Sequence, residues 1–346
     1  MRMPRRSTLV IGHRGAPGYR PEHSRSSYEL ALEFGVDAVE PDVVFTRDAV
    51  AVIRHENEIG TTTDVADRPE FADRRTTKSI DGADLTGWFT EDFTWAELST
   101  LRARERLPKV RPRSASFDDT QPVMRLQDLL DLIRRTGLDQ GREIGVVLEI
   151  KHATYFSGLG YDVPALLAAE LAAGGWDAGQ LPLTVESFEQ TVLAGLRSHG
   201  IRGRYIYLLE ATGRPFDLVA ARGKDAPTYA SQLTSAGLDR LAREVDGVSL
   251  DKKLLLQEKG GRVVGPTDVV ARAHERGLQV YTWTCRPENA FLATSFRRGR
   301  DKTAFGDWEA EWQVIADSGV DGVFVDHPDL GVEFFRGSSG PGGLPR

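Results

Sequence analysis

Three carboxylates stand in otherwise apolar segments of this chain. Glu40 and Asp42 lie in the segment 38–46, and Glu149 lies near the end of the segment 145–150. Because side chains alternate along a strand, Glu40 and Asp42 share one face of theirs. An isolated Glu-x-Asp pair is usually a solvated strand face, but three acids converging at one place need a compensating charge. Oxygen ligands of this kind suit Ca²⁺ or Mg²⁺ better than Zn²⁺.

Histidines and cations occur beside the same segments. His13 and Arg14 follow the apolar run 8–12, His55 follows the run 49–54, and Lys151 shares the strand face of Glu149. Two histidines near a metal can divide proton transfer, one accepting a proton and the other donating one. A guanidinium and an ammonium can hold a phosphate group. We therefore expect catalytic roles for His13 and His55 and phosphate binding by Arg14 and Lys151.

Aromatic residues at two later segments are candidates for the wall of a substrate pocket. Phe188 follows the segment 183–187, and Trp283 alternates with Tyr281 in the segment 278–284. We expect Tyr281 in the core, and Phe188 and Trp283 against substrate. The other histidines lack metal-ligand spacing, and most are expected at the surface or in loops: His23, His152, His199, His274 and His327. Among them His23 stands out, because it lies in the first loop of the expected active face.

The elements that must position these residues alternate between apolar strands and amphipathic helices. Strands are expected at 8–12, 38–46, 145–150, 183–187, 205–209, 247–250, 278–284 and 322–326. Helices are expected after Ser24 and at 126–135, 163–173, 189–198, 238–244, 267–276 and 308–318, with none after the last strand. About eight such strands favour a closed (β/α)8 TIM barrel over an open doubly wound sheet. Strand ends in such a barrel gather the active site on one face.

Two segments depart from this rhythm. Residues 57–121 have few periodic apolar runs and are predicted to form an inserted subdomain after the second strand. Its aromatic residues could pack inside it or form an apolar rim: Trp88, Phe89, Phe93 and Trp95. The barrel domain is predicted to span residues 7–335, and the Gly/Pro/Ser-rich residues 336–346 are predicted to be a flexible tail.

The amino-acid composition excludes some classes of binding partner and binding site. The 346 residues are 40% hydrophobic and 27% charged, with a net charge of −7 that argues against nucleic-acid binding. Cys285 is the only cysteine, so a site built from several thiolates is excluded. No stretch approaches a membrane span, so no stable membrane insertion is expected. The chain reads as cytoplasmic as written, or as secreted if a leader has been removed. The composition is compatible with a homo-oligomer.

Several motifs together resemble the glycerophosphodiester phosphodiesterases, in particular the branch typified by bacterial periplasmic enzymes. The motifs span nearly the whole chain: GHRGAPGYRPEHS, VEPDVVFTRD, IRHENEIGTTTDVADRPEF, GWFTEDFTWAEL, VVLEIK, VESFE, VYTWT and DGVFVDHPD. The family commonly has Asp where this chain has Glu56.

The resemblance implies that His13 and His55 are the catalytic acid and base, and that Arg14 and Lys151 contact phosphate. It also implies that the metal is bound by Glu40, Asp42 and Glu149. The expected reaction is metal-dependent hydrolysis of a small glycerophosphodiester to sn-glycerol 3-phosphate and an alcohol. The resemblance also implies that the insertion, residues 57–121, covers the active face and shapes the substrate pocket.

Two alternatives stay open. One is a phospholipase-D-like or phospholipid-cleaving enzyme on the same barrel, which would need an apolar rim for its lipid substrate. The other is a phosphate-ligand binding protein without turnover, since fold alone does not fix function.

Overall fold

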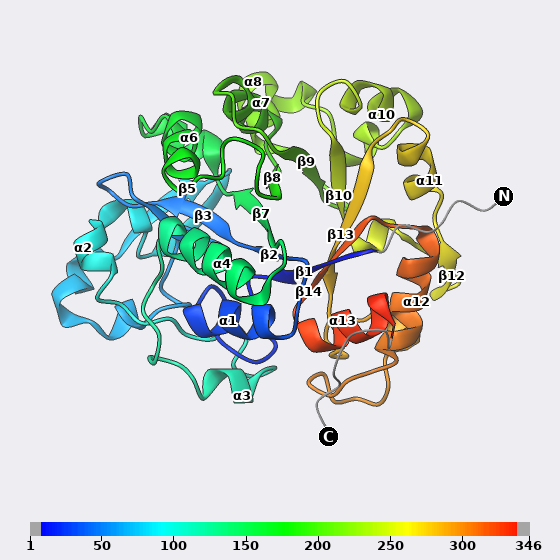
Figure 1. Cartoon of the computed structure of the whole chain (residues 1–346), viewed down its shortest axis with the longest axis horizontal. Coiled ribbons are helices and arrows are strands. Elements are labelled where there is room, and N and C mark those ends of the chain that lie inside the picture. The colour runs from blue at the N-terminus through cyan, green and yellow to red at the C-terminus, as the bar shows by residue number, and fades with distance from the viewer. Residues whose placement is uncertain (1–7, 338–346) are drawn as a thin grey trace.

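The computed structural model describes residues 8–337, and its main sheet closes into a parallel barrel. Figure 1 shows the strands surrounded by an outer layer of helices. The barrel strands are β1 (Leu9–His13), β2 (Ala38–Glu40), β3 (Asp42–Phe45), β7 (Gly145–Ile150), β8 (Leu183–Ser187), β9 (Arg204–Leu209), β10 (Gly247–Asp251), β13 (Gln279–Cys285) and β14 (Gly322–Val325). The (β/α)8 TIM barrel predicted from the sequence is therefore confirmed, and the open sheet is excluded.

Strands β2 and β3 together form the second barrel strand, interrupted at Pro41. Proline has no N–H to donate to a neighbouring strand, but its carbonyl still accepts a 2.9 Å bond from the Glu149 amide. Register places Ala38 of β2 opposite Gly145, and Asp42 of β3 opposite Glu149. The antiparallel strand β4 (Ala51–Ile53) returns alongside β3 and brings the chain to His55.

The outer layer consists of α1 (Arg25–Glu33), α4 (Leu126–Gln140), α6 (Val163–Ala173), α7 (Gln190–Ser198), α8 (Phe216–Arg222), α10 (Ser235–Leu241), α11 (Val269–His274), α12 (Trp308–Ser318) and α13 (Pro328–Arg336). Ser24 caps α1 as predicted, its side chain accepting from the Ser27 amide. Helix α13 contradicts the expectation that nothing helical follows the last strand. Pro328 starts it at a position where a missing N–H costs nothing.

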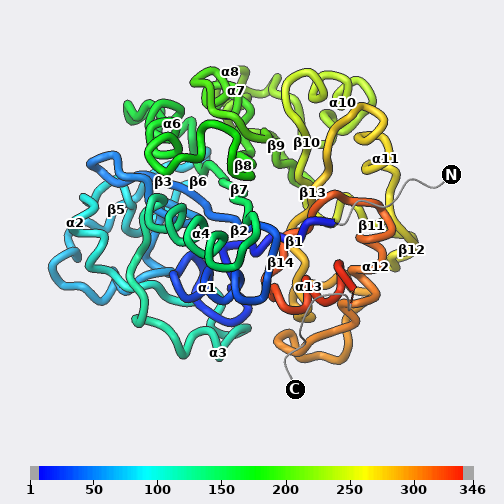
Figure 2. The backbone as a smooth tube through the Cα atoms, viewed as in Figure 1, coloured from blue at the N-terminus to red at the C-terminus, as the bar shows by residue number. Residues whose placement is uncertain are grey.

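The segment 57–121 contains little regular structure. Its elements are the hairpin β5 (Thr76–Ile80) and β6 (Ala83–Gly87), short α2 (Trp95–Leu98) and α3 (Pro112–Ala115), and the 3₁₀ turns Asp64–Asp67, Pro69–Arg74 and Thr90–Asp92. Figure 2 shows this cyan segment gathered on one side of the barrel. Phe89 and Phe93 are fully buried, and Trp88 donates to the Phe71 carbonyl. These contacts support internal packing over an apolar rim.

The remaining elements are α5 (Ala153–Gly158), α9 (Tyr229–Gln232), the hairpin β11 (Leu256–Lys259) and β12 (Arg262–Pro266), and 3₁₀ turns at Gly223–Asp225, Lys252–Leu254 and Thr294–Phe296. The barrel interior is filled below the site by a separate apolar cluster: Ile11, Ala38, Val147, Ile206, Tyr281 and Phe324. Tyr281 is thus a core residue, as predicted. No helix within residues 8–337 is long and apolar enough to cross a membrane. Most of the predicted tail lies outside the described residues, although its first residue, Arg336, ends α13.

Candidate active site

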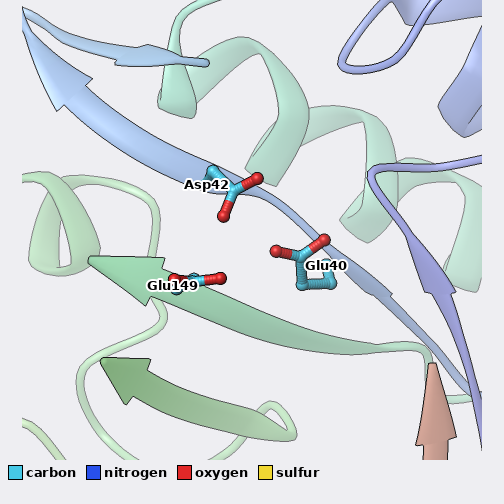
Figure 3. Close-up of side chains that lie close together, drawn as sticks. All are labelled: Glu40, Asp42 and Glu149. Atoms are coloured by element: carbon cyan, nitrogen blue, oxygen red, sulfur yellow. The ribbon is translucent and has the colours of Figure 1, made fainter. Parts of the chain in front are cut away.

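The three carboxylates singled out in the sequence meet at one end of the barrel. One oxygen from each of Glu40, Asp42 and Glu149 lies within 4.8 Å of the other two. In Figure 3 the side chains of Glu40 and Asp42 point from the β2–β3 strand toward Glu149 on β7. All three are buried, and Glu40 Oε1 has no hydrogen-bond partner among the described residues.

Lys151 is the cation nearest to two of these acids. Its Nζ lies 2.5 Å from Glu149 Oε1 and 3.2 Å from Asp42 Oδ1. Arg14 contributes its backbone amide to Glu40 Oε2 at 2.7 Å, while its Nε lies 3.4 Å from Asp42 Oδ2. The Arg14 guanidinium also pairs with Glu22 at 2.8 Å. Both predicted phosphate-binding residues therefore reach the carboxylate cluster, and both line the cavity above it.

The pKa values of the three carboxylates reflect an excess of negative charge in the cluster. Burial and the neighbouring carboxylate of Asp42 raise the pKa of Glu40 well above its usual range. Burial likewise raises the pKa of Glu149 to about 8, against the opposing charge of Lys151. Burial would also raise the pKa of Asp42, but Lys151 and two histidines hold it well below its usual range.

These donors fit a hard divalent cation. Three buried carboxylates converge here, and within residues 8–337 the Glu40 Oε1 atom has no hydrogen-bond partner. They supply the ligand type that Ca²⁺ and Mg²⁺ prefer. A cation placed among them would satisfy the orphan oxygen of Glu40 and relieve the repulsion between the acids.

His13 is held by a buried carboxylate at the end of the last strand. Its Nδ1 lies 2.6 Å from Asp326 Oδ1, so Nδ1–H donates and Nε2 is the basic nitrogen. Asp326 is fully buried and also accepts from Arg111 at 2.6 Å and Arg286 at 2.5 Å. Burial and the charge of Arg14 lower the pKa of His13 to about 4. The ring is therefore neutral near pH 7 and can accept a proton.

His55 is supported by a longer chain of charged groups. Its Nδ1 lies 2.7 Å from Glu56 Oε1, and the other oxygen of Glu56 lies 2.9 Å from His152 Nε2. His152 Nδ1 lies 2.6 Å from Asp81, at the tip of the β5–β6 hairpin. Burial and the charge of Arg14 hold the pKa of His55 well below its usual range. The insertion thus reaches His55 through Asp81, His152 and Glu56.

Arginines of the insertion make two further contacts with this end of the barrel. Arg106 pairs with Glu22 of the first loop at 2.6 Å. Arg111 is nearly fully buried and links Asp326 to Glu288, with a 2.8 Å bond to the latter. The insertion therefore supplies charges that fix both the Arg14 side and the His13 side of the site.

A single large cavity opens over these groups. It has a volume of about 1230 Å³ and is bordered by both catalytic candidates, His13 and His55, together with Arg14 and Lys151. Phe188 and Trp283 line it as predicted, with ring centroids 5.7 Å apart. The cavity and the carboxylate cluster occur at the same barrel end, where strand ends of this fold usually carry function.

Comparison with known proteins assigns the family. Residues 13–330 match the glycerophosphoryl diester phosphodiesterase family. The chain belongs to this family. It is 32% identical to the glycerophosphodiester phosphodiesterase GDPD6 of Arabidopsis thaliana, covering 91% of this chain and 82% of that one. It is 27% identical to the glycerophosphodiester phosphodiesterase of Treponema pallidum, covering 94% and 91%.

Solved structures of similar fold include two bacterial proteins. A glycerophosphoryl diester phosphodiesterase candidate from Silicibacter pomeroyi superposes with a TM-score of 0.65 at 22% identity, covering 97% of this chain and 95% of that one. An Oleispira antarctica phosphodiesterase in complex with the product sn-glycerol-3-phosphate gives 0.62 at 20% identity, covering 95% and 97%. These likenesses confirm the barrel fold.

Within this phosphodiesterase fold, two of the remaining histidines lie in loops and are nevertheless buried. His23 is fully buried, bridging Tyr28 and Asp42 at 2.7 and 2.8 Å, and His327 is also buried. Their positions in loops agree with the prediction, which placed His23 in the first loop of the active face, whereas their burial was not predicted. His199 and His274 are exposed, as expected.

Sequence reasoning assigned no role to Asp326, Glu186 or His152. Asp326 and Glu186 occupy strand ends, the same signal that drew attention to Glu149, but neither belongs to a spaced pair of acids. Register places Glu186 directly opposite Glu149 on the neighbouring strand, and its Oε2 is buried without a hydrogen-bond partner among the described residues. The role of His152 depends on Asp81, which lies 71 residues away in the chain.

Proposed function

We propose that this chain hydrolyses glycerophosphodiesters to sn-glycerol 3-phosphate and an alcohol, using His13 and His55 as the proton-transferring pair. The observation that carries the proposal is the joint placement, at one cavity, of two carboxylate-supported histidines and the converging acids Glu40, Asp42 and Glu149. Membership of the family supports the reaction class. The product bound to the Oleispira antarctica enzyme supports the identity of the product.

Glu40, Asp42 and Glu149 would hold the divalent cation, Ca²⁺ or Mg²⁺ rather than Zn²⁺ by their oxygen-only chemistry. When bound, such a cation polarises phosphoryl oxygens as a Lewis acid. Arg14 and Lys151 bind the remaining phosphoryl oxygens, and their positive charge stabilises the charge that develops during the reaction. The wall formed by Phe188 and Trp283 contacts the apolar parts of the substrate.

In the first step one histidine removes the proton of the glycerol 2-hydroxyl, whose oxygen forms a bond to phosphorus. The phosphorus–oxygen bond to the alcohol breaks, and the other histidine, which must enter this step as the imidazolium, donates its Nε2 proton to the leaving oxygen. In the second step water attacks the cyclic phosphate and gives a proton to the histidine left neutral by the first step. One ring phosphorus–oxygen bond breaks, and the histidine protonated in the first step donates its proton to the leaving 2-oxygen, which gives sn-glycerol 3-phosphate and restores both histidines. Asp326 keeps the His13 imidazole oriented with Nδ1 protonated, and Glu56, whose Oε1 lies 2.7 Å from His55 Nδ1, pairs with the second ring when that ring is charged.

The test is release of sn-glycerol 3-phosphate from glycerophosphocholine and glycerophosphoglycerol, after chelation and then with Ca²⁺, Mg²⁺ or Zn²⁺ restored in turn. We expect His55→Gln to lower kcat about 10²- to 10⁴-fold, and the exposed His199→Gln to serve as the matched control. Binding of intact diester without release would instead support a binding protein. Retention on liposomes with release from phospholipid only would support the lipid-cleaving alternative.

A further inference from the structure

The cavity is far larger than the proposed reaction centre needs. Its volume of about 1230 Å³ exceeds the ~300–1,000 Å³ typical of pockets for drug-sized ligands. The phosphate-binding candidates occupy the arc formed by β1, β2, β3 and β7, whereas the cavity continues over the ends of β8, β9, β10 and β13. The second arc is therefore available to the alcohol half of the diester.

Three aromatic rings form one wall of this second arc. Phe188 stands at the centre, with Trp283 at 5.7 Å and Tyr229 at 6.3 Å, both edge to face. Lys151 Nζ lies 5.8 Å from the Phe188 ring, so this wall begins directly beside the phosphate-binding side. Trp283 Nε1 is buried without a hydrogen-bond partner among the described residues, which leaves an N–H free for a ligand oxygen.

Two carboxylates face the same space. Glu210 follows β9 and lines the cavity, making no hydrogen bond or ion pair with another described residue. Glu210 and Tyr229 border the same part of the cavity, next to Gly213. A Cβ on Gly213 would lie 3.9 Å from Glu210 Oε2 and 3.8 Å from the Tyr229 ring. Asp251 ends β10 directly opposite Trp283 in the β10–β13 register.

The cations near these two carboxylates do not neutralise them. Lys253 lies 3.8 Å from Asp251, but its side chain is 76% exposed, and ion pairs of that kind are weak. Lys252 is committed to a buried pair with Glu311. Burial and the charge of Asp251 raise the pKa of Glu210, and the opposing charges of Lys151 and Lys253 do not reverse this direction.

We infer that Phe188, Tyr229, Trp283, Glu210 and Asp251 form a subsite for a cationic alcohol, of the quaternary or primary ammonium class. Aromatic faces attract ammonium groups through their quadrupole, and the carboxylates of the exposed Glu210 and the half-buried Asp251 add charge attraction. The same charges disfavour an anionic leaving group such as a chain of glycerol phosphate. This inference rests on the proposed function, and names which half of the glycerophosphodiesters the larger part of the cavity recognises.

The experiment compares glycerophosphocholine with its 3,3-dimethylbutyl isostere, in which carbon replaces nitrogen and the charge is lost. We expect kcat/KM to be about tenfold or more higher for the charged diester, as ~1.4 kcal/mol of cation recognition implies. In Glu210→Gln/Asp251→Asn the ratio of the two kcat/KM values should fall toward one. The matched control Glu258→Gln, an exposed acid of the same cavity on β11, should keep the ratio.

A second readout does not require a choline substrate. Tetramethylammonium ion should compete with glycerophosphoglycerol in the wild type, and its inhibition constant should rise at least about fivefold in the double variant. The exposed Glu210→Gln alone serves if the double variant fails to fold. Equal kcat/KM for both diesters in the wild type, or an equal loss of ratio in Glu258→Gln, would overturn the subsite. Absence of release from every diester with every metal would instead overturn the proposed function.

Discussion

Replacing Asp326 by Asn should remove the group that orients His13 while keeping the side chain's size. Asp326 Oδ1 accepts from His13 Nδ1 at 2.6 Å inside a fully buried site, so the acid fixes which ring nitrogen is protonated. An amide can present its NH₂ instead and favour the opposite tautomer. Since Nε2 is then protonated and cannot accept a proton, we expect kcat to fall about 10²- to 10⁴-fold, with a smaller change in KM.

The same substitution should also lower stability. Asp326 neutralises Arg111, whose side chain is 4% exposed, and Arg286, whose side chain is 23% exposed. Arg111 keeps Glu288, so the loss falls mainly on Arg286 and on the shared network. Breaking a buried pair from one side costs roughly 3–5 kcal/mol, and we expect about 3 kcal/mol of unfolding free energy here because one partner is retained.

The effect on stability should depend on pH with a definite sign. Two arginines and His13 hold the pKa of Asp326 well below its usual range despite burial. A group with a depressed pKa stabilises the folded state above its unfolded pKa, near ~3.9, and loses that contribution as pH falls. The difference in unfolding free energy between wild type and variant should therefore be full above about pH 5 and shrink in more acidic solution.

Steady-state release of sn-glycerol 3-phosphate, urea unfolding and ¹⁵N NMR of the His13 ring together test this reasoning. The matched control is Asp317→Asn on the exposed face of α12, where only Gln313 is bonded. If Asp326→Asn is folded and turns over within about threefold of wild type, the orienting role is refuted. If turnover falls but the ring tautomer is unchanged, the loss has another cause.

Three further outcomes are expected. Glu149→Gln should weaken binding of Ca²⁺ or Mg²⁺ by at least about 10-fold in calorimetry, with unchanged affinity contradicting its place in the metal site. Hydrogen bonds to Asp81 and Glu56 outweigh burial and raise the pKa of His152 to about 9. His152→Gln should therefore lower the unfolding free energy by about 3 kcal/mol below pH 6.5, and this difference from wild type should vanish as pH rises through 9. A difference in urea unfolding that stays constant across this range would refute the charged pair. Trp312→Ala should lower the unfolding free energy by about 3–5 kcal/mol, because the ring is fully buried against Trp308, Phe334 and Phe335. The KM for substrate should not change. A changed KM would show that packing around Trp312 affects the active site.

The barrel could be predicted from the sequence because its signals are local. Buried parallel strands read as continuous apolar runs, and the predicted strands 145–150 and 183–187 coincide with β7 and β8. Helix α6 likewise matches its predicted range 163–173. Helix α13 was missed because no strand follows it, so the alternation that identified the other helices gave no signal there.

The carboxylates and the two candidate histidines could also be predicted from the sequence, because a strand end fixes where a side chain points in a barrel. Glu40, Asp42 and Glu149 converge for this reason. The residues that support these side chains lie far from them in the sequence. Asp81 reaches His152 across 71 positions, and Arg111 reaches Asp326 across 215. Both Asp81 and Arg111 lie in the segment 57–121, whose sequence has little periodicity from which a path could be inferred.

The difference between these two kinds of residue has a physical basis. A strand's direction is set by apolar periodicity, which many substitutions preserve, whereas a buried ion pair stabilises only if both partners and their geometry are present together. In this protein each candidate histidine is paired to a carboxylate that is linked to the insertion. The link from His13 runs through Asp326 directly to Arg111, and the link from His55 runs through Glu56 and His152 to Asp81. The insertion therefore contacts the network of charges around both imidazoles. Its folding and the orientation of both imidazoles are coupled, so substitutions within it should change turnover even where they touch no substrate.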